Sequence, residues 1–201
     1  MQNELLDKSV ALAAAFEAAI GDQLAPNSRS GLLASCSYDL LREHHRSVNF
    51  LVEKKHFGSA FALLRPMLEG CLVGLWATYV ASEDDIASFE NSRLTPEPSK
   101  ILQRLKPKDD GDLVTKLKQI YLETKQQLNG YVHSGLIQIS GRIGNDFIGP
   151  NYTKEEICRS LQFSNCMLII AALEISTLTG NSALGERVKG IAAAHVGLTR
   201  S

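Results

Sequence analysis

The sequence predicts an all-α protein, an antiparallel helical bundle. Apolar residues recur at helical spacing through most of the 201 residues, strand-type alternation is scarce, and short turns separate the long periodic segments. We expect a single helical-bundle domain over residues 1–201. Within it, the segment 92–112 is rich in Pro, Lys and Asp, which favours a mobile connection containing one short helix near Ile101.

The first half of the chain contains three predicted helices. An amphipathic helix over about residues 5–20 ends at Gly21, and a long second helix runs over about 28–55. Gly58 then marks a tight connection to the third helix. Pro66 in that helix lacks an amide hydrogen, so the helix either bends there or begins anew with Pro66 in its first turn.

Cap signals mark the helices that follow. Ser82 before three acidic residues predicts the start of a short helix that ends near Asn91. Thr153 and Glu156 match a capping box, which starts a long helix to about Thr179. Between them we expect a long helix over about 113–140, with a break at Gly130 as one option, followed by a glycine-rich connector. A short helix covers roughly 182–195.

The composition excludes some classes of protein. The net charge is −1 and the sequence pI is about 6.5, unlike a strongly basic nucleic-acid binder. The four cysteines form no C-x-x-C pair, so we expect reduced thiols and a cytoplasmic protein.

The stretch 61–80 is nearly long enough to span a membrane, but it contains Arg65 and Glu69. Each would cost about 2.5–3.5 kcal/mol or more at the bilayer centre. The apolar run 166–178 is too short and contains Glu174. The N-terminus lacks the basic region of a signal peptide. We therefore expect no membrane segment.

Arg65 and Glu69 are the most informative pair in the sequence, because they are the charged residues of an otherwise apolar helix. Burying charge is costly unless the charge is paired. Four residues apart, the two side chains share a helix face and can pair. One interpretation is an ion pair at the bundle edge. The other is a polar site facing an internal cleft, where a guanidinium suits planar or phosphate-bearing ligands.

Two adjacent histidines, His44 and His45, lie in the second predicted helix. Counting by three and four residues places His44 on the apolar face and His45 at its border. A histidine on such a face is either a core residue with satisfied hydrogen bonds or part of a site. The H-E-x-x-H zinc motif is absent, and we expect neither a metal nor a cofactor.

Tyr131 and His133 lie between Gly130 and Gly135, which we place in the middle of a long helix. Two glycines there cost about 1 kcal/mol each relative to alanine, which reflects close packing or a functional bend. His133 is the best candidate for a general acid or base, since imidazole changes charge near neutral pH. The alternative is that His133 caps a helix or belongs to a buried hydrogen-bond network.

The blocks LLRPMLEG (63–70) and LNGYVHSG (128–135) resemble a bacterial all-helical family of unknown function, with an Arg-x-x-x-Glu pair and a Tyr-x-His element. This resemblance covers roughly residues 39–140. More loosely, the architecture resembles the higher eukaryotes and prokaryotes nucleotide-binding superfamily, whose helical bundles are often dimers. Many of its members are metal-independent RNases of toxin–antitoxin or phage-defence systems. Their signature places an arginine five residues before a histidine, whereas this chain has Leu128 there.

The resemblance implies a defence or toxin–antitoxin type protein, possible RNase or nucleotide-acting chemistry, and RNA, a nucleotide or a cognate protein as partners. His133 would be the general base or acid, Arg65 or Arg142 would supply the cation, and Glu69 would orient Arg65. His44 would complete the catalytic set, with Tyr131, His45 and Arg142 in binding roles. The alternative is a non-catalytic binding or interaction module, in which these residues only hold the bundle together.

We also expect a homodimer that forms through an apolar helical face. Several long helices have more apolar surface than a simple bundle needs, and large apolar patches usually mark interfaces. The residues in question are Phe163, Met167, Leu168, Ile169 and Ile170.

Overall fold

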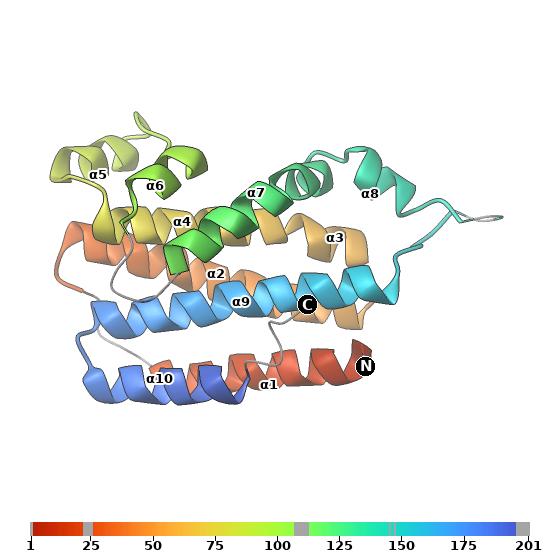
Figure 1. The fold of residues 1–201 in the computed structure, drawn as a ribbon, viewed down its shortest axis with the longest axis horizontal. Helices are drawn as coiled ribbons and strands as arrows, with labels where there is room; N and C mark the ends of the chain where they lie inside the picture. The colour runs from red at the N-terminus through yellow and green to blue at the C-terminus, as the bar shows by residue number, and fades with distance from the viewer. Residues whose placement is uncertain (1, 22–25, 107–112, 145, 147, 196–201) are drawn as a thin grey trace.

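The computed structural model describes residues 2–21, 26–106, 113–144, 146 and 148–195 (Figure 1). The described residues fold into ten α-helices, and their one β-type pairing is an isolated bridge between Ile143 and Ile148. The helices are α1 (Gln2–Ile20), α2 (Arg29–Glu53), α3 (Phe57–Ala62), α4 (Leu64–Tyr79), α5 (Glu83–Glu90), α6 (Pro98–Arg104), α7 (Leu113–Val132), α8 (Leu136–Ser140), α9 (Lys154–Leu178) and α10 (Ser182–Ala194). The predicted all-α bundle is confirmed.

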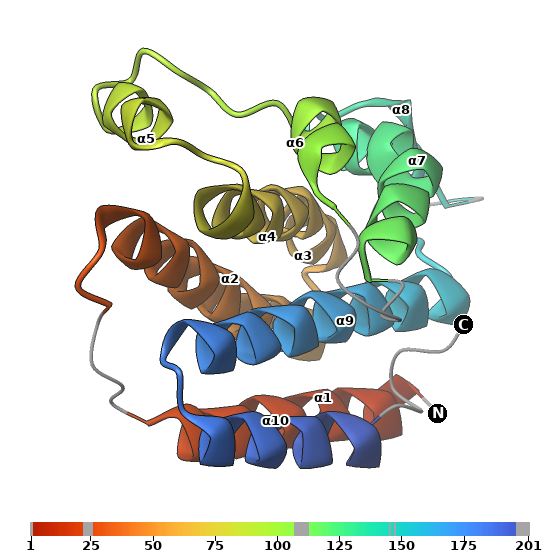
Figure 2. The same ribbon diagram turned by 60° about the vertical axis from the view of Figure 1, so that its left-hand side comes forward.

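Helices α2, α4 and α9 form the centre of the bundle, and each packs against the other two. Helices α1 and α10 lie side by side and cover one side of α9 (Figure 2). Helices α5 to α8 lie on the opposite side, with α6 and α7 packed on α4. Within the pairs α1–α2, α2–α4 and α9–α10 the helices run in opposite directions (Figure 1).

Three predicted helix starts are confirmed by side-chain caps, whereas Gly58, predicted as a connection before the third helix, lies inside α3. Ser28 accepts a hydrogen bond from Gly31 N at the start of α2. Ser82 and Thr153 each form a complete capping box, at the starts of α5 and α9. These caps satisfy backbone N–H groups that the first turn leaves without an intrahelical acceptor.

Helices α3 and α4 meet at Leu63, so the second alternative for Pro66 is correct: a new helix begins, with Pro66 in its first turn. A proline is tolerated there because first-turn N–H groups have no intrahelical acceptor. Further along α4, Gly74 packs against Tyr38 of α2, and a Cβ on Gly74 would lie 2.4 Å from the Tyr38 ring. This glycine therefore permits the close crossing of α2 and α4.

The break after Gly130 is sharper than the sequence predicted, and the placement of His133 in mid-helix is wrong. Helix α7 ends at Val132, and Ser134 has a positive φ of 50°. A Cβ on Gly135 would lie 3.0 Å from Gly130 Cα, while Gly135 N donates to Gly130 O at 2.8 Å. The two glycines thus allow a tight turn, and His133 lies in that turn.

Part of the segment expected to be mobile, 92–112, is packed. Its predicted short helix is α6, and Ile101, Leu102 and Leu105 are buried in the core. Residues 107–112 lie outside the described residues. Mobility of the segment stays a prediction.

Two helical stretches, Phe57–Tyr79 and Lys154–Leu178, are long and apolar enough to cross a membrane by length and composition. In the fold they are central, and 61% of each apolar window is buried inside the bundle. Core helices that pack on several sides are apolar all round for this reason.

The apolar residues expected at a dimer interface on α9 are largely used within the chain. Met167, Leu168 and Ile170 are buried in the core, and Phe163 and Ile169 are half-buried against it. The prediction that these residues supply a dimer face is therefore wrong for the three buried ones. They are apolar because α9 packs against α1, α2, α4 and α10.

Candidate functional site

Three of the predicted site residues come together at the junction of α4 with the end of α7. Arg65 Nε donates to Glu69 Oε1 at 2.8 Å, and Arg65 Nη1 lies 3.2 Å from His133 Nε2. The side chains of Arg65 and Glu69 are 29% and 42% exposed, and His133 is exposed. The predicted Arg65–Glu69 pairing with partial exposure is confirmed. Solvent reaches all three groups.

The contact between Arg65 and His133 can be a hydrogen bond in one direction. A guanidinium has donors only, so His133 Nε2 must present a lone pair to Arg65. Glu69 holds the guanidinium from the other side through Nε. The three residues are therefore linked in the order carboxylate, guanidinium, imidazole.

A cleft of about 140 Å³ adjoins this cluster, between α4, the start of α6 and α7. Arg65 and Glu69 line it together with Tyr121, Lys125 and Asn129. The Lys125 ammonium lies 5.8 Å from the centre of the Tyr121 ring, a cation–π distance. Sequence reasoning missed these α7 residues. Their spacing of four places Tyr121, Lys125 and Asn129 on one helix face, but only the packing of α7 on α4 turns that face toward Arg65.

His44 is not part of this cluster. It is half-buried on α2 and does not line the cleft beside Arg65. The assignment of His44 to the apolar face and of His45 to its border is also wrong, because His45 is the fully buried residue. Helix α2 is buried on the sides that face α1, α4 and α9, so a single apolar stripe did not describe its orientation.

His45 belongs to a buried polar network between α1, α2 and α9 that the sequence did not indicate. His45 Nε2 lies 2.9 Å from Asn165 Oδ1 and Nδ1 lies 3.5 Å from Asn49 Nδ2. The Ser9 hydroxyl lies 2.6 Å from Asn165 Oδ1 and 2.8 Å from Asn49 Oδ1. Burial lowers the pKa of His45 to about 4, against a weaker opposing effect of its bond to Asn165. His45 is therefore neutral at pH 7 and serves the core.

Tyr131 and Arg142, the other expected binding residues, lie elsewhere. Tyr131 is buried, accepts a hydrogen bond from Gln127 Nε2 at 2.9 Å and packs against Phe61. Burial raises the pKa of its hydroxyl. Arg142 is exposed in the connector after α8. Neither residue lines the cleft beside Arg65.

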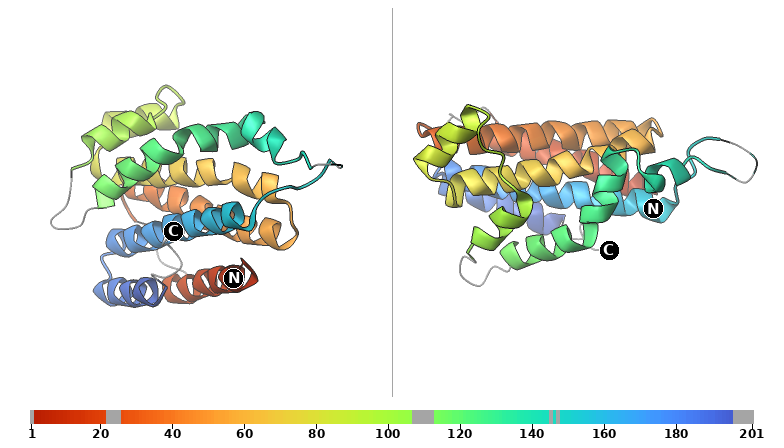
Figure 3. Two further views of the ribbon diagram at one scale, coloured as in Figure 1. Left: turned by 45° about the vertical axis from the view of Figure 1, so that its right-hand side comes forward. Right: turned by 90° about the horizontal axis from the view of Figure 1, so that it is seen from above.

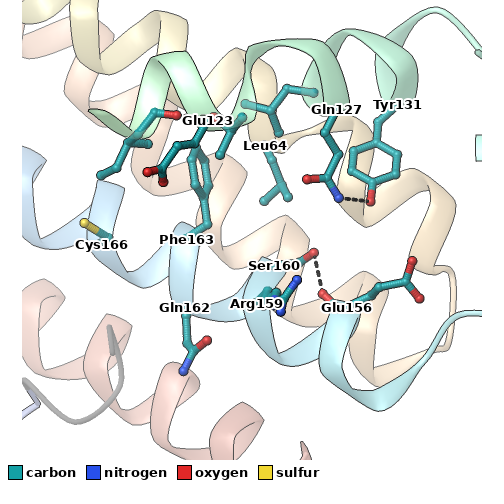
Figure 4. A pocket seen from close by; sticks show the side chains of 13 residues that line it. Leu64, Glu123, Gln127, Tyr131, Glu156, Arg159, Ser160, Gln162, Phe163 and Cys166 are labelled. Carbon is teal, nitrogen blue, oxygen red and sulfur yellow. Dashed lines mark hydrogen bonds between the residues drawn. The ribbon is translucent and has the colours of Figure 1, made fainter. Parts of the chain in front are cut away.

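A larger groove, of about 360 Å³, lies on the other side of α7 (Figure 4). Its walls are α7 and α9, and Leu64 of α4 lies between them. Glu123 and Gln127 extend from α7 and Phe163 from α9. Tyr131 lines this groove, so α7 separates Tyr131 from the cleft that contains Arg65. Among the described residues, no three His, Cys, Asp or Glu side chains group as metal ligands.

The chain belongs to a family of unknown function, DUF6988, whose model matches residues 38–200. The match includes α4 and the α7–α8 turn, and therefore Arg65, Glu69 and His133, but not α1 with Ser9. The resemblance to a family of unknown function is thus confirmed at the level of an all-helical family. No curated protein and no solved structure matches the chain.

Proposed function

We propose that the protein is a metal-independent ribonuclease of the defence or toxin–antitoxin type. Its active site would be the Arg65–His133 contact together with the adjoining cleft, which Arg65, Glu69 and Lys125 line and His133 does not. The observation that carries the proposal is the 3.2 Å contact between Arg65 Nη1 and His133 Nε2. It places a base and a cation together where solvent reaches both. Glu69 holds the cation in position through a 2.8 Å hydrogen bond.

The chemistry follows from the groups present. When the Arg65 guanidinium turns from His133 toward the bound phosphate, the freed Nε2 of His133 accepts the proton of a ribose 2′-hydroxyl, and the resulting oxygen attacks the adjacent phosphorus. The bond from phosphorus to the 5′-oxygen breaks, and that oxygen takes a proton from the imidazolium or from water. Arg65 and Lys125 stabilise the negative charge that develops on the phosphate oxygens. The products are a 2′,3′-cyclic phosphate and a 5′-hydroxyl.

The position of Arg65 also bears on the resemblance to the nucleotide-binding superfamily. The signature arginine is missing, because Leu128 stands five residues before His133 and is buried. Arg65 brings a guanidinium to the same histidine from a helix 68 residues away. This supports a relation to the superfamily, because Arg65 of α4 can supply the cation that the signature arginine supplies in its members. Arg142 does not take this role in the described structure.

Incubation of the purified protein with end-labelled RNA in the presence of a chelator tests the proposal. We expect cleavage products with 2′,3′-cyclic phosphate ends. Arg65→Gln should lower the rate by about 10²–10³-fold, the effect of removing one charge-stabilising donor. Arg29→Gln is the matched control, because Arg29 also pairs with a glutamate, Glu90. Arg29 does not line the cleft. Wild-type protein that cleaves no RNA contradicts the proposal.

One observation favours the alternative, a non-catalytic interaction module. The Glu69–Arg65–His133 chain connects α4 to the turn between α7 and α8, which is what a purely structural tie would do. Under this alternative, His133→Ala frees the turn and lowers the free energy of unfolding by about 1–3 kcal/mol, and wild-type protein has no RNase activity. The two measurements on one variant separate the functions.

A further inference from the structure

Helix α8 has its apolar side turned outward. The side chains of Leu136 and Ile139 are 80% and 52% exposed. The polar residue Gln138, by contrast, is half-buried and its Nε2 donates to Gly58 O of α3 at 2.9 Å. This hydrogen bond ties α8 to the body of the bundle by its polar side. The helix therefore presents its apolar side away from its own core.

The connector after α8 extends this apolar surface. Ile143 and Ile148 form the isolated bridge and are 60% and 94% exposed. Gly149 N donates to Arg142 O at 2.8 Å, and Asn151 N donates to Gly141 O at 2.8 Å, so the two sides of the connector are paired. We call Leu136, Ile139, Ile143 and Ile148, with Arg142, the arm. It projects from one end of the molecule (Figures 1 and 3).

The base of the arm is fixed to the bundle by aromatic contacts. The Tyr152 ring packs 5.0 Å from Phe61 and 6.0 Å from Phe57, measured between ring centres. A Cβ on Gly141 would lie 2.2 Å from the Tyr152 ring, so the connector passes directly over it. The arm is thus held in an outward position. Exposed apolar patches of this kind mark interaction sites.

The groove between α7 and α9 is lined by apolar and polar side chains together. Its apolar lining comes from Leu64, Ile120 and Phe163. Two carboxylates, Glu123 and Glu156, and one guanidinium, Arg159, also line it, and Arg159 already pairs with Glu155 of its own helix at 2.5 Å. The Glu156 carboxylate already accepts hydrogen bonds from Thr153 N and Oγ1, at 2.7 and 2.8 Å, in the capping box. Glu123 is exposed on α7 and accepts one hydrogen bond from Gln119, at 2.8 Å.

We propose that the arm of one copy of this chain binds in the α7–α9 groove of a second copy, which forms a homodimer by reciprocal exchange of arms. The aliphatic side chains of the arm pack on the apolar part of the groove, which Leu64, Ile120 and Phe163 form. Arg142, the one lysine or arginine in residues 133–149, pairs with the exposed carboxylate of Glu123. Each copy supplies one arm and one groove, so two equivalent contacts close a twofold dimer.

Size measurement by light scattering at micromolar concentration tests this proposal. We expect wild-type protein at twice the 22.0 kDa chain mass. The double variant Leu136→Glu with Ile139→Glu should be monomeric, because it places charge on the arm. Val10→Glu, at an exposed apolar residue of α1 that is 51% exposed, is the control and should remain dimeric. Wild-type protein that is monomeric overturns the proposal.

A charge exchange tests which surface receives the arm. Glu123→Arg alone and Arg142→Glu alone should each raise the dimer dissociation constant by about tenfold or more, since each places like charges together. The combined variant should recover most of the wild-type affinity. Both positions are exposed, so folding of the chain does not depend on them. A dimer that responds to the arm variant, but shows no recovery in the combined variant, means that arms pack on each other and overturns the groove assignment.

Discussion

His45 and His133 occupy opposite environments in one small bundle. His45 is fully buried among Ser9, Asn49 and Asn165, and its neutral ring connects three helices of the core. His133 is exposed in a turn, and its Nε2 faces the guanidinium of Arg65. Burial in the first case removes access to any substrate. In the second case the ring has both a cationic neighbour and solvent access, which are the conditions for acid–base chemistry.

The comparison shows why residue type alone does not identify a site. A buried polar network holds its helices together through the hydrogen bonds among its members, so the loss of one member leaves the others without partners. An exposed ring beside a cation contributes little to stability and can contribute to a reaction. Substitution at the two positions should therefore have opposite consequences.

The largest loss of stability is expected for His45→Ala. The change removes hydrogen-bond partners of Asn165 and Asn49 and leaves a cavity in the core, so the free energy of unfolding should fall by about 3 kcal/mol. Urea denaturation measures it. His44→Ala is the neighbouring control and should change stability by less than about 0.5–1 kcal/mol, because His44 is only half-buried. Equal losses at both positions would contradict the assignment of His45, and not His44, to the buried core side of α2.

Acid should weaken the core through the same histidine. The folded-state pKa of His45 is about 4, below the ordinary value of 6.5, so the fold favours the neutral ring. This contribution is fully present above pH 6.5 and is lost as pH falls toward 4, by about 3 kcal/mol at most. Unfolding free energies at pH 7, 5.5 and 4.5 measure the loss. His45→Gln should show a shallower dependence over this window, and an unchanged slope would contradict the assignment.

Gly74 and Gly190 also lie in opposite environments, one packed against a neighbouring helix and the other open. Gly74→Ala should destabilise by about 2 kcal/mol, because the new Cβ would overlap the Tyr38 ring. Gly190→Ala in α10, where nothing lies within 4 Å of the new Cβ, should stabilise by about 0.5–1 kcal/mol through helix propensity. Thermal unfolding of both variants gives the two signs. A neutral Gly74→Ala would mean that α2 and α4 adjust their crossing freely.

The smallest change in stability is expected for His133→Ala. The side chain is exposed, so the free energy of unfolding should change by no more than about 0.5 kcal/mol. Denaturant titration of this variant beside His45→Ala shows whether the two histidines differ as described. A loss above about 1 kcal/mol would assign His133 to a structural tie between α4 and the turn.

Much of the fold followed from local signals in the sequence. Ser82 and Thr153 indicated helix starts because a cap depends on residues within one turn. The Arg65–Glu69 pair followed from its spacing of four for the same reason. The meeting of Arg65 with His133 did not follow, since it depends on how α7 packs against α4.

Two other features could not be read from the sequence, for related reasons. Helix α2 is buried on several sides, so its periodicity did not separate His44 from His45. Helix α8 is only five residues long, too short for a periodic pattern to show which side faces the bundle. In both cases the orientation is set by tertiary contacts, and local spacing carries no information about them.

The central claim is that His133 is the general acid or base of a ribonuclease. The initial rate of RNA cleavage by the His133→Ala variant tests this claim most directly. The account predicts a rate about 10²–10⁴-fold below that of the wild-type protein, the usual contribution of a general acid or base, with an unchanged thermal midpoint. A variant that cleaves RNA at the wild-type rate would contradict the claim, as would a wild-type protein without RNase activity.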